Sequence, residues 1–458
     1  MDKSEQLGEE KISSLLLKFS IPAIIGMLVS AMYNIVDRIF VGRTVGEPGI
    51  AGITIGFPFM LILMAFGMLI GIGATTLVSI RLGEKKKDEA EVIFGNAFTL
   101  LIGMAIALTV AGLIFLDPLL RLSGASEAIL PYARDFMRII LFGSIFQNIS
   151  FGMNNFIRAE GNPKIAMFTM LIGAILNIIL DAIFVLNFGW GVQGAALATI
   201  ISQAVSAVWV LYYFLGKKSM LKIHIKNLKL QWPIITQIAI IGSAPFAMQM
   251  VASVLSIIIN NSLKLYGGDV AIAGMGIINS IAMLILMPIF GINQGVQPII
   301  GFNYGAKKFD RVKHALKLAV IAATIVVTIG FIITQLFTRQ IISIFSKNEM
   351  HLVEFSVHAL RVFLLFLPII GFQIVGASYF QAVGKPKQAM LLSLSRQVIL
   401  LIPAILILPI FFKLEGILIA GPVADLGASI ITAIWIYREL KNLDDKHQMS
   451  YIVQAQTD

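Results

Sequence analysis

The stretch LLLKFSIPAIIGMLVSAMYNIVDRIFVG, residues 15–42, decides the fold class. A helix needs about 20 mostly apolar residues to cross a hydrocarbon core ~30 Å thick, and this stretch is longer. The polar segment before it, MDKSEQLGEEKISS, lacks a signal-peptide cleavage pattern, and the apolar part is too long for a signal-peptide core. We therefore interpret residues 15–42 as a first transmembrane span that is retained in the mature protein. Asp37 then needs an explanation, because membrane helices avoid charge at that depth.

The composition extends this interpretation to the whole chain. Of the 458 residues, 58% are hydrophobic and 13% are charged, whereas soluble proteins carry about 25% charged residues. The chain has no cysteine, which excludes disulfides, thiolate metal sites and cysteine nucleophiles. We predict an all-α membrane protein with twelve transmembrane helices. The predicted spans are 15–42, 49–80, 90–116, 130–157, 163–188, 191–215, 233–265, 269–301, 310–337, 353–380, 387–411 and 415–438.

The distribution of basic residues predicts the orientation. Loops after the even-numbered spans hold eighteen Lys and Arg residues, and loops after the odd-numbered spans with their flanks hold nine. Lys and Arg concentrate in cytoplasmic loops, so both termini and the even-numbered loops are expected in the cytoplasm. The same location explains the net charge of +10, so the charge does not indicate nucleic-acid binding.

The chain also repeats itself at a fixed offset. GEKKKD (83–88) matches GAKKFD (305–310) at an offset of 222, and RAEGNPKIAM (158–167) matches QAVGKPKQAM (381–390) at 223. Six spans per repeat give both halves the same orientation, so an axis along the membrane normal should relate two six-helix bundles. This arrangement is typical of transporters that rock two bundles about a central cleft. The predicted domains are an N-terminal lobe (1–215), a cytoplasmic linker (216–232), a C-terminal lobe (233–441) and a cytoplasmic tail (442–458).

The basic linker admits two interpretations. Its sequence GKKSMLKIHIKNLKLQW could bind anionic lipid headgroups as a polybasic segment. It could instead simply connect the two lobes, and we favour that interpretation.

Two acids in the N-terminal lobe fall at similar depths. Asp37 and Asp181 each come shortly before the outer end of an outward-running span, within roughly 8–12 Å of that end. Thr199 reaches a similar depth on the next, inward-running span. Tyr33 and Asn177 lie four residues before the two acids, on the same helical faces. Five polar side chains from three helices are therefore expected in one layer.

This layer predicts a cation or proton site. Carboxylate, amide and hydroxyl oxygens are hard ligands that could hold Na⁺, at Asp37, Asn177, Asp181 and Thr199. The two carboxylates could instead share a proton, because burial and mutual repulsion favour the neutral form. A structural alternative is that each acid pairs with a nearby Arg or faces water. Arg38 is a poor partner for Asp37, because adjacent residues point about 100° apart on a helix.

Other polar residues in the spans have weaker signals. Arg396 either faces the cleft or snorkels toward the cytoplasm, and we favour snorkelling. Asp425 follows a Gly-Pro pair, and a role in an ion relay is left open. We expect Glu160 to pair with Arg158 in a loop. Pro22 and Pro245, at equivalent places in the two halves, each remove a backbone hydrogen bond and permit a kink, either static or hinge-like.

Catalytic motifs are absent from the sequence. It has no Walker A, HExxH or G-x-S-x-G motif, and its five histidines are scattered over loops and helix ends. We therefore do not expect an enzyme. We expect no cofactor apart from a coupling ion.

The motifs together resemble a known family. YNIVD (33–37), NIILD (177–181), RAEGNPK (158–164) and QPIIGFNYGAKK (297–308), in twelve spans with two halves, resemble the multidrug and toxic compound extrusion (MATE) family, in its DinF/MepA-like branch. The resemblance covers nearly the whole chain. It implies a secondary antiporter of a bacterial cytoplasmic membrane that exports varied, often cationic or amphipathic drugs. Inward movement of H⁺ or Na⁺ would drive the export.

The resemblance also implies roles for single residues. Asp37, Asn177, Asp181 and Thr199 match the family's cation ligands, and Tyr33 and Asn154 match supporting positions. Pro22 matches the residue at which the family's first helix is thought to bend. The NorM-like branch has an acid in the seventh helix where this chain has Asn260-Asn261, so a second cation site in the C-terminal lobe is not implied.

Partners follow from the same resemblance. The expected partners are small-molecule drugs and membrane lipid, without nucleic acid, and the protein is expected to act as a monomer. The alternative function is a lipid-linked-oligosaccharide flippase of the same superfamily. Such flippases commonly have fourteen spans, and the predicted twelve argue against that alternative.

Overall fold

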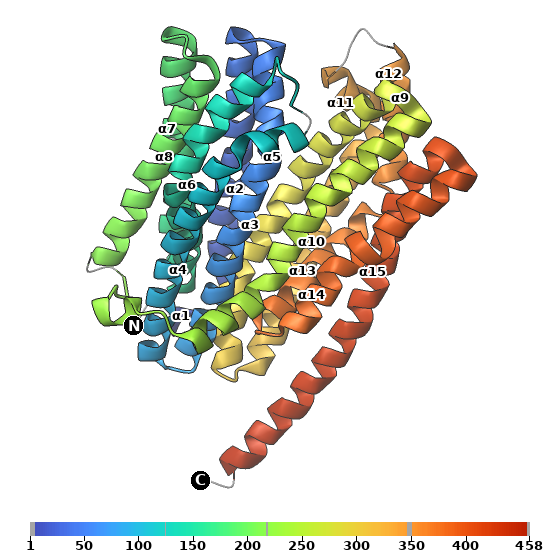
Figure 1. Ribbon diagram of the computed structural model, residues 1–458. Coiled ribbons are helices and arrows are strands. Elements are labelled where there is room, and N and C mark those ends of the chain that lie inside the picture. Colours follow the sequence, from blue (N-terminus) through green and yellow to red (C-terminus); the bar gives the residue numbers. More distant parts are fainter. Residues whose placement is uncertain (1–4, 124, 217–218, 346–349, 456–458) are drawn as a thin grey trace. The chain divides into compact units, whose positions relative to one another are not determined.

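The computed structural model describes residues 5–123, 125–216, 219–345 and 350–455. These residues form helices joined by short turns (Figure 1). The helices are α1 (Glu5–Glu9), α2 (Ile12–Thr44), α3 (Glu47–Gly83), α4 (Lys87–Ile114), α5 (Leu116–Leu122), α6 (Leu130–Ala159), α7 (Pro163–Asp181), η1 (Ala182–Asn187), α8 (Gly191–Leu215), η2 (Ile225–Leu228), α9 (Trp232–Gly305), α10 (Phe309–Leu336), α11 (Thr338–Phe345), α12 (Met350–Phe363), α13 (Leu367–Ala382), α14 (Pro386–Leu394), η3 (Ser395–Leu401) and α15 (Ile402–Ala455).

The number of spans agrees with the twelve predicted. Ten helical stretches in the described residues are long and apolar enough to cross a membrane, and the pair α12 and α13, bent by 52°, adds an eleventh. One of the ten, Pro386–Asp444, is 59 residues long and leaves helical geometry at Lys413. The close approach of residues on the two sides of this break shows that the chain reverses there. A Cβ on Gly416 would lie 2.5 Å from the carbonyl carbon of Leu408. That reversal makes two spans of the stretch, and the prediction of an all-α, twelve-span membrane protein is confirmed.

The described chain divides into two compact units. The first unit holds Met1–Glu9 and Ile25–Phe246, and the second holds Glu10–Ile24 and Ala247–Asp458. The predicted lobes end in loops, whereas these units divide α2 and α9 within the helices. The two division points lie 222 residues apart, which is the offset of the sequence repeat. The repeat therefore extends from sequence to packing.

Close helix contacts repeat in the same way within each unit. In the first unit, a Cβ added to Gly73 of α3 would lie 3.0 Å from the backbone nitrogen of Gly242 in α9. In the second unit, a Cβ added to Gly295 of α9 would lie 2.8 Å from the backbone nitrogen of Ser20 in α2. Gly73 and Gly295 are related by the repeat, and so are Ser20 and Gly242. Both contacts need a glycine, because backbone meets backbone.

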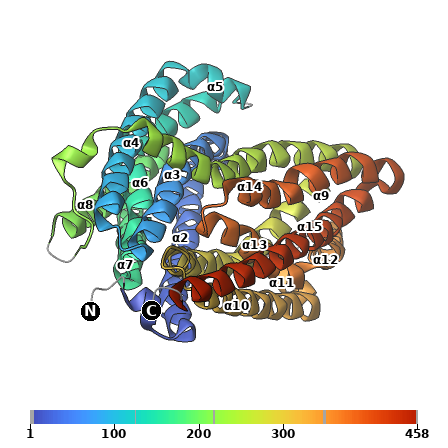
Figure 2. The ribbon, with the colours of Figure 1, turned by 90° about the horizontal axis from the view of Figure 1, so that it is seen from below.

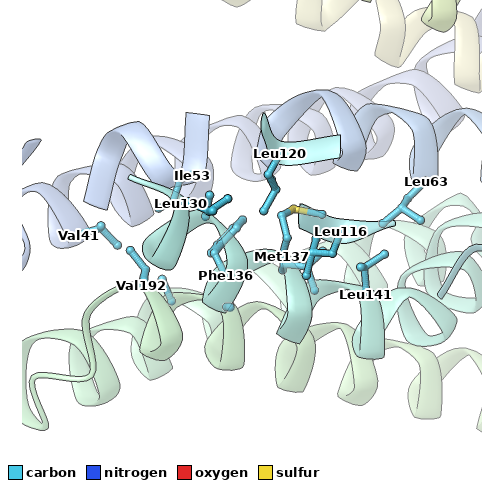
Figure 3. Packing of buried hydrophobic residues seen from close by; sticks show 14 of the residues in the cluster. Val41, Ile53, Leu63, Leu116, Leu120, Leu130, Phe136, Met137, Leu141 and Val192 are labelled. Atoms are coloured by element: carbon cyan, nitrogen blue, oxygen red, sulfur yellow. The ribbon is translucent and has the colours of Figure 1, made fainter. Parts of the chain in front are cut away.

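The core of the first unit centres on α6, which packs against α3, α4 and α8. Figure 3 shows part of its apolar cluster, in which Phe136 and Met137 of α6 lie between residues from neighbouring helices. The short helix α5 contributes Leu116 and Leu120 to the same cluster. This packing fixes α8 against α6, and α8 in turn packs on α7.

The linker packs against helices of the first unit. The carboxylate of Glu160 is fully buried and accepts hydrogen bonds at 2.6 Å from Tyr213 Oη, Ser219 Oγ and the backbone nitrogen of Leu221. Burial raises the pKa of Glu160, although these hydrogen bonds act in the opposite direction. The predicted Glu160–Arg158 ion pair is therefore wrong. Arg158 instead donates to Asn155 Oδ1 at 2.5 Å, because Glu160 turns toward the linker.

Helix α4 holds the rest of the linker (Figure 2). The side chain of Asn96 donates to the carbonyl of Asn227 at 3.2 Å and accepts from the backbone nitrogen of Gln231 at 2.7 Å. Thr99 donates to the carbonyl of Leu228 at 2.9 Å. The part of the linker that the structure describes is thus a docked segment, held by α4 and by Glu160.

Candidate functional site

The turn between α7 and α8 builds the frame of the predicted polar layer. α7 ends at Asp181 and continues into the π-helical segment η1. Gly189 and Gly191 then take φ values of 69° and 52°, which L-residues with side chains rarely adopt. These two glycines let the chain reverse within a few residues, so α8 runs back along α7.

This hairpin brings two of the predicted residues together. Asn177 on α7 is 2% exposed and Thr199 on α8 is 7% exposed. The Nδ2 of Asn177 donates to Thr199 Oγ1 at 3.4 Å. The side-chain oxygen of Asn177 is buried and accepts no hydrogen bond from the described part of the chain. A buried amide oxygen without a hydrogen-bond partner can serve as a ligand for a cation.

Asp181 lies one helical turn beyond Asn177. Its side chain is completely buried, and neither carboxylate oxygen has a hydrogen-bond partner among the residues that the structure describes. Burying an ionised carboxylate without a partner carries a penalty on the order of several kcal/mol. The geometry therefore favours a positive ion or a proton at this carboxylate.

Asp37 on α2 completes the pair of acids. It is 9% exposed and lies close enough to Asp181 for the two carboxylates to repel each other electrostatically. Tyr33, one turn earlier on α2, is half-buried. The two acids lie 144 positions apart in the chain, and the fold of the first unit brings them close to each other.

Two further predicted residues lie on α6 and in the first part of α2. Asn154 is buried on α6, and its side-chain oxygen accepts no hydrogen bond within the described residues. Pro22 lies inside α2, in the part of that helix that belongs to the second unit, whereas Asp37 belongs to the first. The division of α2 falls two residues after Pro22.

Ser202 is a residue that the sequence interpretation missed. It lies three residues after Thr199 on α8, is 2% exposed, and its hydroxyl has no partner within the described chain. Residues three apart share a helix face, so this spacing was a signal. A single hydroxyl in an apolar span is common, and without the structure nothing distinguishes it.

Aromatic rings cover the turn beside this layer. Phe184 stacks on Trp190 with ring centroids 5.1 Å apart, and Phe188 lies 5.2 Å from Trp190. Trp190 and Phe188 are both exposed. Tryptophan gathers at membrane–water interfaces, so this cluster indicates that the turn lies at the edge of the apolar layer.

The chemistry of the layer suits a hard cation or a proton. Its candidate ligand atoms are carboxylate, amide and hydroxyl oxygens, which suit Na⁺ better than a transition metal. Among the described residues, no group of three or more His, Cys, Asp or Glu residues could hold a metal ion.

Arg396 and Asp425 form an ion pair in the second unit. Arg396 Nε lies 2.5 Å from Asp425 Oδ1. The interpretation that Arg396 snorkels is therefore wrong. The side chain reaches a buried carboxylate on the neighbouring helix, which neutralises it where it lies.

Comparison with known families decides the identity of the fold. A sequence profile described as MatE matches residues 22–183 and 245–406, which together cover more than half of the chain. The chain belongs to the MatE family. The two matches begin 223 residues apart, so the MatE profile follows the internal repeat. MatE proteins are membrane transporters, and this chain is a multi-pass membrane protein of that family.

The sequence similarity to named MatE relatives extends over nearly the whole chain. The chain is 29% identical over 445 residues to the multidrug export protein MepA of Staphylococcus haemolyticus (strain JCSC1435), covering 96% of this chain and 97% of that protein. It is also 29% identical over 451 residues to MepA of Staphylococcus aureus (strain MRSA252), with 96% and 98% coverage.

Solved structures agree with the MatE assignment. The MATE multidrug transporter DinF-BH, solved in complex with a ligand, is 41% identical and superposes with a TM-score of 0.90, covering 96% of this chain and 98% of that chain. An outward-facing multidrug resistance MATE transporter of the MOP superfamily, 24% identical, superposes with a TM-score of 0.91 over 96% and 98% of the two chains. That second likeness shows the fold alone. The predicted resemblance to the DinF/MepA-like branch is confirmed.

Proposed function

We propose that the protein is a secondary multidrug efflux antiporter whose coupling ion, H⁺ or Na⁺, binds in the first unit at Asp37 and Asp181. The observation that carries the proposal is the buried carboxylate of Asp181, which lies beside a second acid and has no partner in the described chain. An ion-coupled antiporter needs a buried charged group that is stable only when a coupling ion is bound to it. A fully buried, unpartnered acid has that property.

The proposed ligands of the ion come from three helices. Asp181 and Asp37 supply the charge, and the side-chain oxygens of Asn177 and Thr199 supply neutral ligands from the adjoining turns. Tyr33 and Asn154 support the site from α2 and α6. A proton needs only the carboxylates, whereas Na⁺ also uses the neutral oxygens.

The transport cycle follows from competition between ion and drug. Binding of the ion at the outer side neutralises the acids, and α2, which carries Asp37, changes conformation near Pro22. That change weakens drug binding, and the drug leaves to the outside. The protein then turns inward, releases the ion and takes up drug. The ion drives this exchange only through its different affinities for the two states.

Drug-like substrates are supported by the relatives. MepA is named a multidrug export protein, and DinF-BH is named a multidrug transporter. The abundance of Met and Phe, 20 and 31 residues, suits an adaptable apolar binding surface. We also infer that the chain lies in the bacterial cytoplasmic membrane with both termini and the linker in the cytoplasm. The excess of basic residues in the even-numbered loops supports this orientation.

Dye transport in everted vesicles tests the proposal. A pH gradient and a Na⁺ gradient are imposed separately, and dye accumulation is followed for the parent protein and for Asp181→Asn and Asp37→Asn. We expect one gradient to drive accumulation by the parent, and neither variant to respond although both reach the membrane in parental amounts. Full gradient-driven transport by both variants would contradict the proposed site.

A further inference from the structure

An ion pair lies at mid-depth of the membrane in the second unit. Asp425 of α15 has 3% of its side chain exposed, and Arg396 of η3 has 28%. Arg396 comes ten residues after Pro386, where α14 begins, and Asp425 comes twelve residues after the reversal at Lys413. At about 1.5 Å per residue both lie roughly 15–18 Å from a helix end, near the middle of a ~30 Å core. Neither charge is therefore at a membrane surface.

The local backbone brings the two groups together. Arg396 is the second residue of the π-helical segment η3, Ser395–Leu401, which packs against α15. A π-helical turn changes the direction of side chains relative to the preceding α-helix, and such turns are frequent at functional sites. The structure thus uses an irregular turn where Arg396 meets Asp425.

The repeat places this pair on the same two helices as the first unit's layer. Residues 387–411 and 415–438 correspond to residues 163–188 and 191–215. By the offset of 222, Arg396 corresponds to Ala174 and Asp425 to Gln203. These positions lie about one turn from Asn177 and Thr199. Each half of the chain therefore carries a buried carboxylate at or near the contact between its fifth and sixth spans.

The two halves differ in how that carboxylate is neutralised. Asp181 in the first unit has no partner among the described residues, whereas Asp425 accepts from a guanidinium at 2.5 Å. Among the described residues, Arg396 is the charged group within ion-pair distance of Asp425. His358 pairs with Glu415, and Lys385 pairs with Glu439. A guanidinium does not lose its proton in a protein, so its charge stays on throughout.

We infer that Arg396 is a tethered cation for Asp425: it permanently supplies the positive charge that a transported ion supplies to the acids of the first unit. The second unit then has no need of a coupling ion at this position, and the pair is a fixed polar joint between its last two spans. The comparison with the first unit rests on the proposed function. The neutralisation of Asp425 is tested on protein stability, so the two proposals can fail separately.

The first test removes each partner in turn. Arg396→Gln leaves a carboxylate at mid-depth without its cation, and Asp425→Asn leaves the guanidinium without its anion. We expect each single variant to lower the Tm of the purified transporter by more than about 5 °C, and the double variant Arg396→Gln/Asp425→Asn to recover most of the loss. A double variant no more stable than the singles, or singles as stable as the parent, would overturn the inference.

The second test asks whether charge is what Arg396 supplies. Lowering the pH protonates the orphaned Asp425, so the Tm of Arg396→Gln should rise toward the parent's as pH falls, and the double variant should show no such trend. Ethylguanidinium added at millimolar concentration should raise the Tm of a smaller variant, Arg396→Ala, and leave the parent unchanged. A uniform Tm loss at every pH, with no rescue, would mean that Arg396 only fills space.

A surface ion pair provides the matched control. Arg134 Nε lies 2.7 Å from Asp117 Oδ1, in side chains that are 42% and 43% exposed. Exposed pairs contribute little to stability, so Asp117→Asn/Arg134→Gln and its single variants should hardly change the Tm.

Drug efflux is the last readout. The Arg396→Gln/Asp425→Asn variant should keep gradient-driven efflux, and a stable double variant without efflux would overturn the inference.

Discussion

The side-chain amide of Asn177 donates a hydrogen bond to Thr199 Oγ1 at 3.4 Å and joins α7 to α8 one turn before Asp181. The contact is long for a hydrogen bond, and the oxygen of the same amide has no partner in the described chain. Both groups are therefore poised to turn toward an ion at the carboxylate.

Asn177 and Thr199 should act as one unit in transport. Asn177→Ala and Thr199→Val are each expected to raise the ion concentration for half-maximal drug efflux about 5- to 20-fold, because each removes an oxygen from the same site. The double variant should lose less than the product of the two effects, since contacting residues are not additive. Thr236→Val, which removes an exposed hydroxyl bonded to its own helix at 2.9 Å, serves as the control. Multiplicative losses would show that the two residues act independently.

The close contact at Gly242 should not tolerate a methyl group. A Cβ on Gly242 would lie 1.8 Å from the backbone oxygen of Leu69, whereas nothing lies within 4 Å of a Cβ on Gly103 of α4. We expect Gly242→Ala to destabilise the protein by about 1–3 kcal/mol, as overpacking does. Gly103→Ala should be neutral or stabilise by up to about 1 kcal/mol, because alanine favours the helix. Thermal unfolding of the two variants side by side measures the difference, and equal Tm values would refute the packing of α9 on α3.

Glu160 should make linker docking depend on pH. Burial raises the pKa of Glu160 in the docked state above the ordinary value of 4.5, so the docked state binds the proton more tightly. The resulting stabilisation is full below pH ~4.5 and is lost as the pH rises through the docked-state pKa. Because the chain has no native cysteine, Ile225→Cys, at a position 88% exposed, can carry a spin label in the linker.

The label should become more mobile between pH 5 and pH 8. Glu160→Gln should abolish that trend, because glutamine does not titrate. His224, whose Nε2 lies 3.3 Å from Glu91, is replaced by Gln in both proteins, so that the two proteins differ at residue 160 alone. A mobility that is independent of pH with Glu160 present, or the same trend with Gln, would contradict the assignment.

Much of this structure follows from local patterns that the sequence shows directly. The number of spans depends on the length of the apolar stretches, so it is predictable. Counting residues from helix ends places Thr199 at the depth of the two acids, with Asn177 one turn deeper in the same layer. The lack of a hydrogen-bond partner for Asp181 is not predictable from the sequence, because it depends on which side chains of α2 and α8 reach its carboxylate. Depth counting predicts proximity, whereas only packing decides hydrogen bonding.

Two misinterpretations have a common cause in tertiary contacts. The sequence favours a snorkelling Arg396, but the chain leaves helical geometry at Lys413 and Arg396 donates to Asp425 on the helix that follows. Glu160 was paired with its neighbour Arg158, but the linker supplies closer donors from Ser219 and Leu221. In both places a contact between residues far apart in the chain replaced the local one.

The most direct measurement of the central claim is drug affinity of the purified protein as a function of its coupling ion. Binding of a fluorescent cationic dye is measured by anisotropy across pH 5.5–8.5, with and without Na⁺, for the parent and for Asp181→Asn. Ion and drug that compete through Asp181 must weaken each other equally, so the parent's dye affinity should fall about tenfold as one ion rises. The Asp181→Asn variant should bind dye with one affinity under all conditions. An ion dependence that survives in Asp181→Asn, or a parent affinity that no ion changes, would contradict the account.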